Sequence, residues 1–295
     1  MKPLRGNYLA PIENYTTLPF RLLAQKHGAK ATMAPLVSAT AIARNPDYLR
    51  QLDIREDEKF LGVQLVGSIP ADFSTAAKAL VREFPFIKWL DINAGCPSGK
   101  TVGSGCGAAL LDRPGKAMRI VSETAKAGLP VSVKMRLADS AEKTLQFVKA
   151  VQGADFLIVH GRTRAQFYSG KADWDAIKGI KENSKIPVVG NGDVISLESG
   201  NEKVRAGVCD SFMVGRAALS NPLLFERKEV ETKEAKKKLF LEYLELAESH
   251  GPCSCSGLKL AAYEIFKGLD GSAALRGSLC TLSSKREIME KIKGF

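Results

Sequence analysis

Short apolar segments recur at fairly even intervals along the first three quarters of the chain, and they constrain its fold more than any other feature. Their lengths and their apolar side chains are typical of buried strands. The eight segments are centred on Leu9, Met33, Val63, Leu90, Val133, Ile158, Val188 and Met213. Segments with helical spacing lie between them, including residues 70–84, 116–127 and 144–151. Strands that alternate with helices predict a parallel sheet, and eight such units predict an α/β protein with a (β/α)₈ barrel.

The pattern changes after Pro222. From Glu231 to Phe295 no segment has the features of a strand, whereas residues 236–248 and 258–266 have helical spacing. We therefore predict two domains, a (β/α)₈ barrel over residues 1–229 and a small all-helical domain over residues 230–295.

The net charge bears on the kind of partner the chain binds, and the lack of a signal peptide or membrane span bears on its location. Its net charge of +11 favours association with polyanions, although the same charge could serve solubility alone. No apolar run reaches the roughly 18 residues that cross a bilayer, and the N-terminus lacks the apolar core of a signal peptide. The six cysteines do not suggest a disulfide framework. We expect a cytoplasmic protein without a membrane partner, and nothing points to an obligate protein partner.

The active site of a (β/α)₈ barrel forms at the carboxyl ends of its strands. Polar, cationic and glycine residues collect at the ends of five of the first six predicted strands, all but the second, whereas the strands themselves are apolar. These residues are Pro11, Ile12, Glu13, Gln64, Asn93, Cys96, Lys134, Arg136, His160, Arg162 and Arg164.

The loops after the seventh and eighth predicted strands often form a phosphate site in such barrels. Gly190, Gly192 and Gly215 would let the backbone approach a ligand, and Arg216 would add positive charge. Each loop alone could be an ordinary glycine-containing turn. Because both loops occupy the expected positions, together they favour a phosphate site.

Two motifs suggest other nucleotide folds, and their surroundings argue against both. Residues 94–101, AGCPSGKT, lack the first glycine of a P-loop. Gly103, Gly105 and Gly107 follow, and such a run of glycines resists the helix that a P-loop requires. Residues 103–108, GSGCGA, match GxGxxA but do not lie directly between a strand and a helix, as a dinucleotide fold would need.

Seven segments together resemble the tRNA-dihydrouridine synthase family, in that family's order from Ala10 to Leu219. They are APIENYTTLPFR, VQLVG, DINAGCPSGKTVGSGCGAALL, KMR, HGRTRAQFYSGKADW, VVGNGDV and VGRAAL. The helical tail resembles the family's C-terminal domain more loosely, through Lys267-Gly268 and Arg276. The chain departs from the family pattern at Glu13-Asn14-Tyr15 and at Cys106.

The resemblance implies reduction of uridine in tRNA to 5,6-dihydrouridine by FMN, with NADPH or NADH as the electron source. It implies that Cys96 is the catalytic acid and that Asn93 and Arg136 lie near the substrate base. The residues it places around the flavin and its phosphate are Pro11, Ile12, Glu13, Gln64, Lys134, His160, Asn191, Gly192, Asp193, Gly215 and Arg216.

Several alternatives remain open at this stage. Cys96 could be a small buried apolar residue instead of an acid, and His160 could be a hydrogen-bonded core histidine. Arg162 and Arg164 could be surface charges or could bind substrate phosphates. The enzyme could instead act on a small pyrimidine such as dihydroorotate, or the chain could be an RNA-binding protein without catalysis.

The tail raises two further questions. Its net charge is only +2, from 11 Lys or Arg and 9 Asp or Glu between Val230 and Phe295. We therefore expect tRNA to lie across both the barrel mouth and the tail, with Lys100 and Lys236 to Lys238 as candidates besides the two arginines. A metal site is not expected, because the CxC spacing within the set His250, Cys253, Cys255 and Cys280 is tighter than common zinc signatures.

Overall fold

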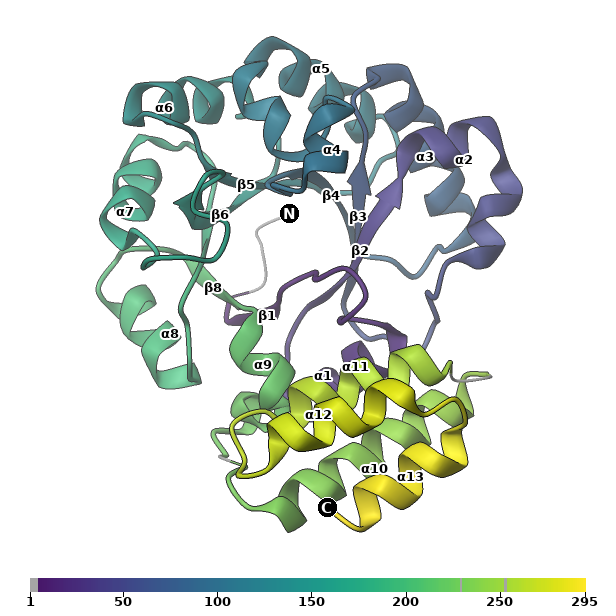
Figure 1. Ribbon diagram of the computed structural model, residues 1–295. Helices are drawn as coiled ribbons and strands as arrows, with labels where there is room; N and C mark the ends of the chain where they lie inside the picture. Colours follow the sequence, from purple (N-terminus) through teal and green to yellow (C-terminus); the bar gives the residue numbers. More distant parts are fainter. Residues whose placement is uncertain (1–4, 229, 252–253) are drawn as a thin grey trace.

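The computed structural model describes residues 5–228, 230–251 and 254–295, and its central element is a barrel of eight parallel strands (Figure 1). The strands are β1 (Asn7–Leu9), β2 (Thr32–Ser38), β3 (Leu61–Val66), β4 (Trp89–Ala94), β5 (Val131–Leu137), β6 (Phe156–Thr163), β7 (Val188–Asn191) and β8 (Ser211–Val214). They pair in the order β1-β8-β7-β6-β5-β4-β3-β2. A parallel bridge between Tyr8 and Ala31 links the two ends of this order. Each of the eight predicted strands is present, so the predicted barrel is confirmed.

Helices separate the strands and cover the outside of the barrel (Figure 1). The α-helices are α1 (Leu18–Lys26), α2 (Ala39–Arg44), α3 (Pro70–Glu83), α4 (Gly99–Gly103), α5 (Pro114–Ala125), α6 (Ala141–Ala150), α7 (Trp174–Asn183), α8 (Leu197–Arg205) and α9 (Arg216–Ser220). Three 3₁₀ helices, η1 (Pro46–Gln51), η2 (Gly107–Asp112) and η3 (Pro222–Glu226), complete the connections. Ser140 and Ser196 begin α6 and α8 by accepting a hydrogen bond from the backbone three residues on.

The inside of the barrel is filled by large side chains, which close it at the end opposite the loops that follow the strands. Tyr8, Met33, Trp89, Phe156 and Met213 belong to one buried cluster there. Gly62 on β3 makes room for this packing, because a Cβ at that position would lie 2.2 Å from the Trp89 ring. Any ligand must therefore bind at the carboxyl ends of the strands.

A helical region follows the barrel, as the sequence predicts. It consists of α10 (Lys233–Ser249), α11 (Cys255–Ile265), α12 (Ser272–Thr281) and α13 (Lys285–Lys293), which lie together beside α1 and α9 (Figure 1). Phe20 and Leu23 of α1 share one hydrophobic cluster with Phe240, Tyr243 and Leu258 of the tail. The tail is thus joined to the barrel by a continuous apolar core. In the described part of the chain, no helix is long and apolar enough to span a membrane.

The glycine-rich segment after β4 differs from expectation. A helix does form there: α4 begins after Ser98, whose side chain accepts a hydrogen bond from the backbone nitrogen of Thr101. It ends at Gly103, only five residues on. Gly105 and Gly107 then adopt positive φ angles of 74° and 59°. The glycines limit the helix in length but do not prevent it, because the serine cap satisfies its first turn.

Candidate active site

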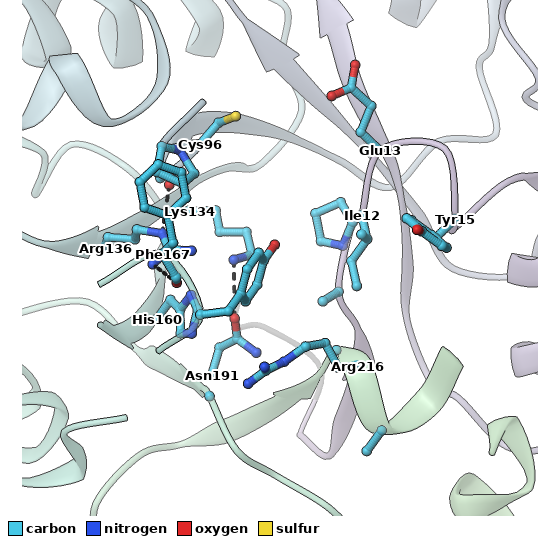
Figure 2. A pocket seen from close by; sticks show the side chains of 18 of the residues that line it. Ile12, Glu13, Tyr15, Cys96, Lys134, Arg136, His160, Phe167, Asn191 and Arg216 are labelled. Carbon is cyan, nitrogen blue, oxygen red and sulfur yellow. Dashed lines mark hydrogen bonds between the residues drawn. The ribbon is translucent and has the colours of Figure 1, made fainter. Parts of the chain in front are cut away.

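A cavity of about 620 Å³ opens at the carboxyl ends of the strands, which is a size typical of ligand pockets. All the predicted strand-end residues line it except Gly190, Arg162 and Arg164. Figure 2 shows Lys134, His160 and Asn191 on one side of the cavity, with Ile12 facing them. The strand ends therefore bring together side chains that are up to about 200 residues apart in sequence, as the barrel geometry predicts.

A buried carboxylate begins a chain of side-chain hydrogen bonds beneath the cavity. Asp91 on β4 is fully buried and accepts a hydrogen bond from the hydroxyl of Ser132 and one from Gln64 Nε2, the latter at 2.8 Å. The amide nitrogen of Gln64 faces the carboxylate, which suits the ionised form because that form only accepts hydrogen bonds. The amide oxygen of Gln64 therefore faces Asn93, whose Nδ2 donates to it at 2.8 Å. Asp91 was not among the predicted site residues, because its side chain lies below the cavity.

The same chain of hydrogen bonds reaches Cys96. With its nitrogen committed to Gln64, Asn93 directs its side-chain oxygen toward the backbone nitrogens of Gly95 and Cys96, at 3.1 and 2.9 Å. The Cys96 thiol lies at the rim of the cavity, 3.6 Å from the hydroxyl of Thr101. Gly107 supports this arrangement, since a Cβ there would lie 2.7 Å from the Cys96 carbonyl oxygen.

Lys134 on β5 supplies a cation to the cavity wall. Its Nζ donates to Asn191 Oδ1 at 3.2 Å, and Asn191 Nδ2 donates to the carbonyl of Met213 on β8. Burial lowers the pKa of Lys134 to about 8, and the nearby Asp91 carboxylate opposes that shift. Burial likewise raises the pKa of Asp91 to about 7, against its two hydrogen bonds and the charge of Lys134. The two groups stabilise each other's charged forms in a site that disfavours isolated charges.

His160 on β6 is neutral. Burial, followed by the charges of Lys134 and three arginines, lowers the pKa of His160 to about 2. Its Nε2 lies 3.4 Å from Nη1 of Arg162, an arrangement in which the neutral ring accepts the hydrogen bond. His160 therefore offers a polar, uncharged edge to the cavity.

Asp193, in the loop after β7, holds two arginines. It adopts a left-handed φ of 50° and accepts hydrogen bonds from Arg162 at 2.8 Å, Arg216 at 3.1 Å and the backbone nitrogen of Ala172 at 2.8 Å. Burial favours a higher pKa for Asp193, but these donors hold it below its usual value. Since phosphate and carboxylate are both anions, Asp193 is suited to position Arg216 instead of touching a phosphate itself.

The two arginines expected at the substrate occupy different environments. Arg162 is 1% exposed, and besides Asp193 its guanidinium donates to the carbonyl oxygens of Ser169 and Gly170. This corrects the expectation that it contacts substrate, because its side chain is turned inward to support the loop after β6. Arg164 is exposed and lies outside the cavity lining. Arg136 does line the cavity, while donating to the carbonyls of Gly95, Thr163 and Phe167.

Several cavity residues were not predicted. Tyr168 lies between two guanidinium groups, 5.5 Å from that of Arg136 and 5.1 Å from that of Arg216. Lys267, at the end of α11, reaches the cavity from the tail. Phe167 and Tyr168 could have been found from their place in the loop after β6. The sequence marked Lys267 only through its Lys-Gly match in the tail, and it is the packing of the tail on the barrel that brings this residue to the cavity. The other unpredicted lining residues include Tyr15, Leu36, Ser98, Ile195 and Ser220.

The tail residues discussed for metal binding have other contacts. His250 lies 2.7 Å from Asp57 of the barrel, and the Cys255 thiol lies 3.2 Å from the carbonyl of Ser283. The Cys280 thiol lies 3.3 Å from the hydroxyl of Tyr263, and Cys253 is outside the described residues. Among the residues with described positions, no group of three or more His, Cys, Asp or Glu side chains is arranged to hold a metal ion.

Lys236 also differs from expectation. It is only 5% exposed, and its Nζ donates to the carbonyl oxygen of Lys267 at 2.8 Å. It therefore joins α10 to the end of α11 and is not free to bind RNA. Lys237 is half-buried and donates to the carbonyl of Lys293, whereas Lys238 is exposed.

Comparison with known sequences gives a consistent result. Residues 8–272 match the family model described as dihydrouridine synthase. A "Probable tRNA-dihydrouridine synthase" of Rickettsia conorii is 34% identical, over 97% of this chain and 92% of its own length. A protein of the same name from Aquifex aeolicus is 31% identical, over 97% of this chain and 94% of its own length. The "tRNA-dihydrouridine(47) synthase [NAD(P)(+)]" of Coprinopsis cinerea is 30% identical over 85% of this chain and 41% of its own.

Solved structures resemble the chain in fold. Histamine dehydrogenase from Rhizobium sp. 4-9 superposes with a TM-score of 0.56 at 13% identity, over 81% of this chain and 48% of its own. 2-Naphthoyl-CoA reductase superposes with a TM-score of 0.58 at 10% identity, over 76% of this chain and 49% of its own. At these identities the likeness concerns the barrel alone.

Proposed function

The chain belongs to the dihydrouridine synthase family, and we propose that it reduces uridine in tRNA to 5,6-dihydrouridine, with a bound flavin and NAD(P)H as the electron source. The observation that carries this proposal is the strand-end cavity, where an anchored thiol, a buried cation and a neutral imidazole converge. Action on a small pyrimidine such as dihydroorotate, the alternative considered from sequence, is not supported by this family membership.

The cavity residues fit FMN, which we propose as the flavin. Lys134, Gln64 and Asn191 present a cation and amide groups along one wall, which suits the polar edge of an isoalloxazine ring. At the other end, Gly192 and Gly215 line the cavity beside Arg216, which Asp193 orients. A single arginine between two glycine-containing loops suits one phosphate group. When bound, the flavin would supply the hydride that the reaction needs.

We assign the proton transfer to Cys96. Reduction of the uracil C5–C6 bond requires a hydride at C6 and a proton at C5, so a general acid must stand opposite the hydride donor. The thiol is held at the cavity rim by the hydrogen bonds that the backbone nitrogens of Gly95 and Cys96 donate to Asn93 Oδ1. Lys134 would stabilise the negative charge that a reduced flavin carries, because its ammonium is buried where charge acts strongly.

We propose that tRNA binds over the cavity mouth and the adjacent tail. The net charge of +11 favours a polyanionic substrate. Arg164, Lys100 and Lys238 are exposed and available for phosphates. Arg162 and Lys236 are excluded from this role by their burial. The target base has to leave its stack to enter the cavity, and phosphate contacts elsewhere would offset that cost. A tRNA substrate also fits the cytoplasmic location that we propose.

Two measurements test the proposed function. The purified protein should be yellow and should release FMN, not FAD, on denaturation; a colourless protein would favour an RNA-binding role without catalysis. Mass mapping of dihydrouridine in tRNA from cells with and without the gene should show loss of the modification at defined positions. Unchanged dihydrouridine at every position would contradict the assigned reaction.

A further inference from the structure

Apolar side chains gather at the mouth of the active-site cavity although they are exposed. Of the six large hydrophobic side chains that are exposed among the described residues, three line this cavity. They are Phe167 at 50%, Tyr168 at 51% and Ile195 at 73% exposed, in the loops after β6 and β7. Clusters of exposed apolar groups beside a pocket mark a binding surface.

The loop that carries the two aromatic residues is held in place from beneath. Arg136 donates to the carbonyl oxygens of Thr163 and Phe167, at 3.1 and 2.6 Å. Arg162 donates to those of Ser169 and Gly170, at 3.1 and 2.6 Å. Two buried guanidinium groups thus fix four carbonyls of one short loop. The backbone that carries its two aromatic side chains is therefore held in place by these hydrogen bonds.

The backbone of Phe167 gives the clearest sign that this loop holds its side chains in one conformation. Its φ of 47° is in the left-handed region, which a bulky residue rarely adopts. Strain of this kind persists where the surroundings enforce it, and it clusters at functional positions. Tyr168 already lies against Arg136 and Arg216, whereas in the described residues the ring of Phe167 has no aromatic or cationic partner. Phe167 lies on the same side of the cavity as Cys96 and Arg136 (Figure 2).

The charges around Phe167 indicate what could cover it. Arg164 and Lys171, both exposed, flank the aromatic pair on the same loop. Aromatic residues between cations are typical of surfaces that bind single-stranded nucleic acid, where bases stack on rings and cations contact the backbone. An apolar protein partner would gain nothing from these two cations.

We propose that Phe167 is a stacking site for an unpaired nucleobase of the RNA, next to the uridine that enters the cavity. This proposal rests on the proposed function and adds a second subsite to it. Extraction of the target uridine separates it from its neighbours, and an exposed ring at the cavity mouth would give one neighbouring base a new stacking surface. The subsite is sequence-tolerant, because every base has a π-face.

The test compares Phe167→Ala with Phe167→Trp and with Met118→Ala in the full-length flavoprotein. Met118 is a matched control, since it is 53% exposed but lies on α5, outside the cavity lining. Phe167→Ala should weaken binding of unmodified tRNA about tenfold. The dependence of affinity on salt should not change, because no charge is lost. Phe167→Trp should retain parental affinity, Met118→Ala should have no effect, and flavin content should be equal in all four proteins.

The outcomes separate this subsite from the function on which it rests. Parental tRNA affinity in Phe167→Ala would overturn the proposal while leaving the enzyme assignment intact. If Phe167→Ala instead raised the KM for NADPH in flavin reduction without changing tRNA affinity, the ring would serve the reductant, and the proposal would also be overturned. Failure of the parental protein to bind tRNA or to reduce uridine would count against the function itself.

Discussion

The side-chain oxygen of Asn93 lies 2.9 Å from the backbone nitrogen of Cys96, so one amide fixes the strand end that carries the thiol. The orientation of that amide is not free. Gln64 accepts from the Asn93 nitrogen, and Gln64 itself is oriented by the buried carboxylate of Asp91. The position of the thiol is thus determined by three side chains at and beneath the barrel end.

We predict that Asn93→Ala lowers the rate of uridine reduction about 10- to 100-fold, because a misplaced acid loses its alignment with the reacting carbon. Flavin content should fall less than twofold. The rate is measured by single-turnover reaction of the reduced enzyme with unmodified tRNA. Asn183→Ala, an exposed position at the end of α7, is the control and should behave like the parent. An unaltered rate in Asn93→Ala would show that the thiol does not depend on this amide.

Removal of the thiol should affect one half of the reaction only. Cys96→Ala is expected to retain flavin and tRNA affinity and to oxidise NADPH normally, while uridine reduction falls at least about 100-fold, as expected when a general acid is lost. The two half-reactions are followed separately by flavin absorbance. Cys106→Ala, in the same glycine-rich segment, serves as control. If Cys96→Ala reduces tRNA at the parental rate, another group is the acid.

Arg216 should contribute to flavin affinity more than to stability. It is half exposed and pairs with Asp193, so Arg216→Leu should weaken FMN binding about tenfold, in line with loss of a charge-assisted contact. The unfolding midpoint of the flavin-free protein should hardly change, since exposed ion pairs contribute little. Isothermal titration of flavin-free protein with FMN measures the effect, with Arg164→Leu as control. Equal affinities would remove Arg216 from the phosphate site.

The neutral state of His160 predicts a specific pH dependence of stability. Its pKa is about 2 in the folded chain and 6.5 in the unfolded chain, so below pH 6.5 the unfolded state binds a proton that the folded state excludes. Above pH 6.5 this group should therefore not reduce the free energy of unfolding. Below pH 6.5 it should lower that free energy by up to about 1.4 kcal/mol per pH unit. His160→Gln lacks the proton site. Urea unfolding of both flavin-free proteins between pH 4.5 and 7.5 should show that the parent loses stability relative to the variant on acidification.

The sequence predicts the barrel well because each strand is a short apolar run followed by polar residues. The same pattern identifies strand-end residues such as Lys134 and His160, since position in a (β/α)₈ barrel determines which side chains meet. It cannot tell which way a strand-end arginine turns. Arg162 and Arg136 are both buried, yet only Arg136 lines the cavity. The Arg162 guanidinium donates instead to the carbonyls of Ser169 and Gly170 and to Asp193.

Contacts between the tail and the barrel are also beyond sequence pattern. Lys236 belongs to a run of three lysines that suggests a solvated face, but it is buried against the end of α11. Lys267 has no strand-end position to mark it, yet it lines the cavity. Both facts depend on how α10 and α11 pack, which periodicity alone does not specify.

The contribution of backbone charge to tRNA binding is best tested without truncation. Removing the tail would expose Phe20 and Leu23 of α1, which share a core with α10 and α11, so a shortened chain would lose stability as well as lysines. Single substitutions avoid this problem. Lys238→Gln on α10 and Lys100→Gln on α4 remove exposed charges from the tail and from the barrel mouth.

We predict that each of these variants weakens tRNA binding several-fold at low salt and that the loss shrinks as salt rises. A lysine that contacts a phosphate releases a counterion, so its removal should reduce the slope of log affinity against log salt by about 0.7 to 0.9. Lys185→Gln is the matched control, because Lys185 is exposed but precedes β7, at the end of the barrel opposite the cavity. Flavin content and NADPH oxidation should be unchanged in all three variants. If Lys238→Gln has the parental affinity and slope while Lys100→Gln does not, the lysine on α10 is a solvated charge and the tRNA backbone is held from the barrel side.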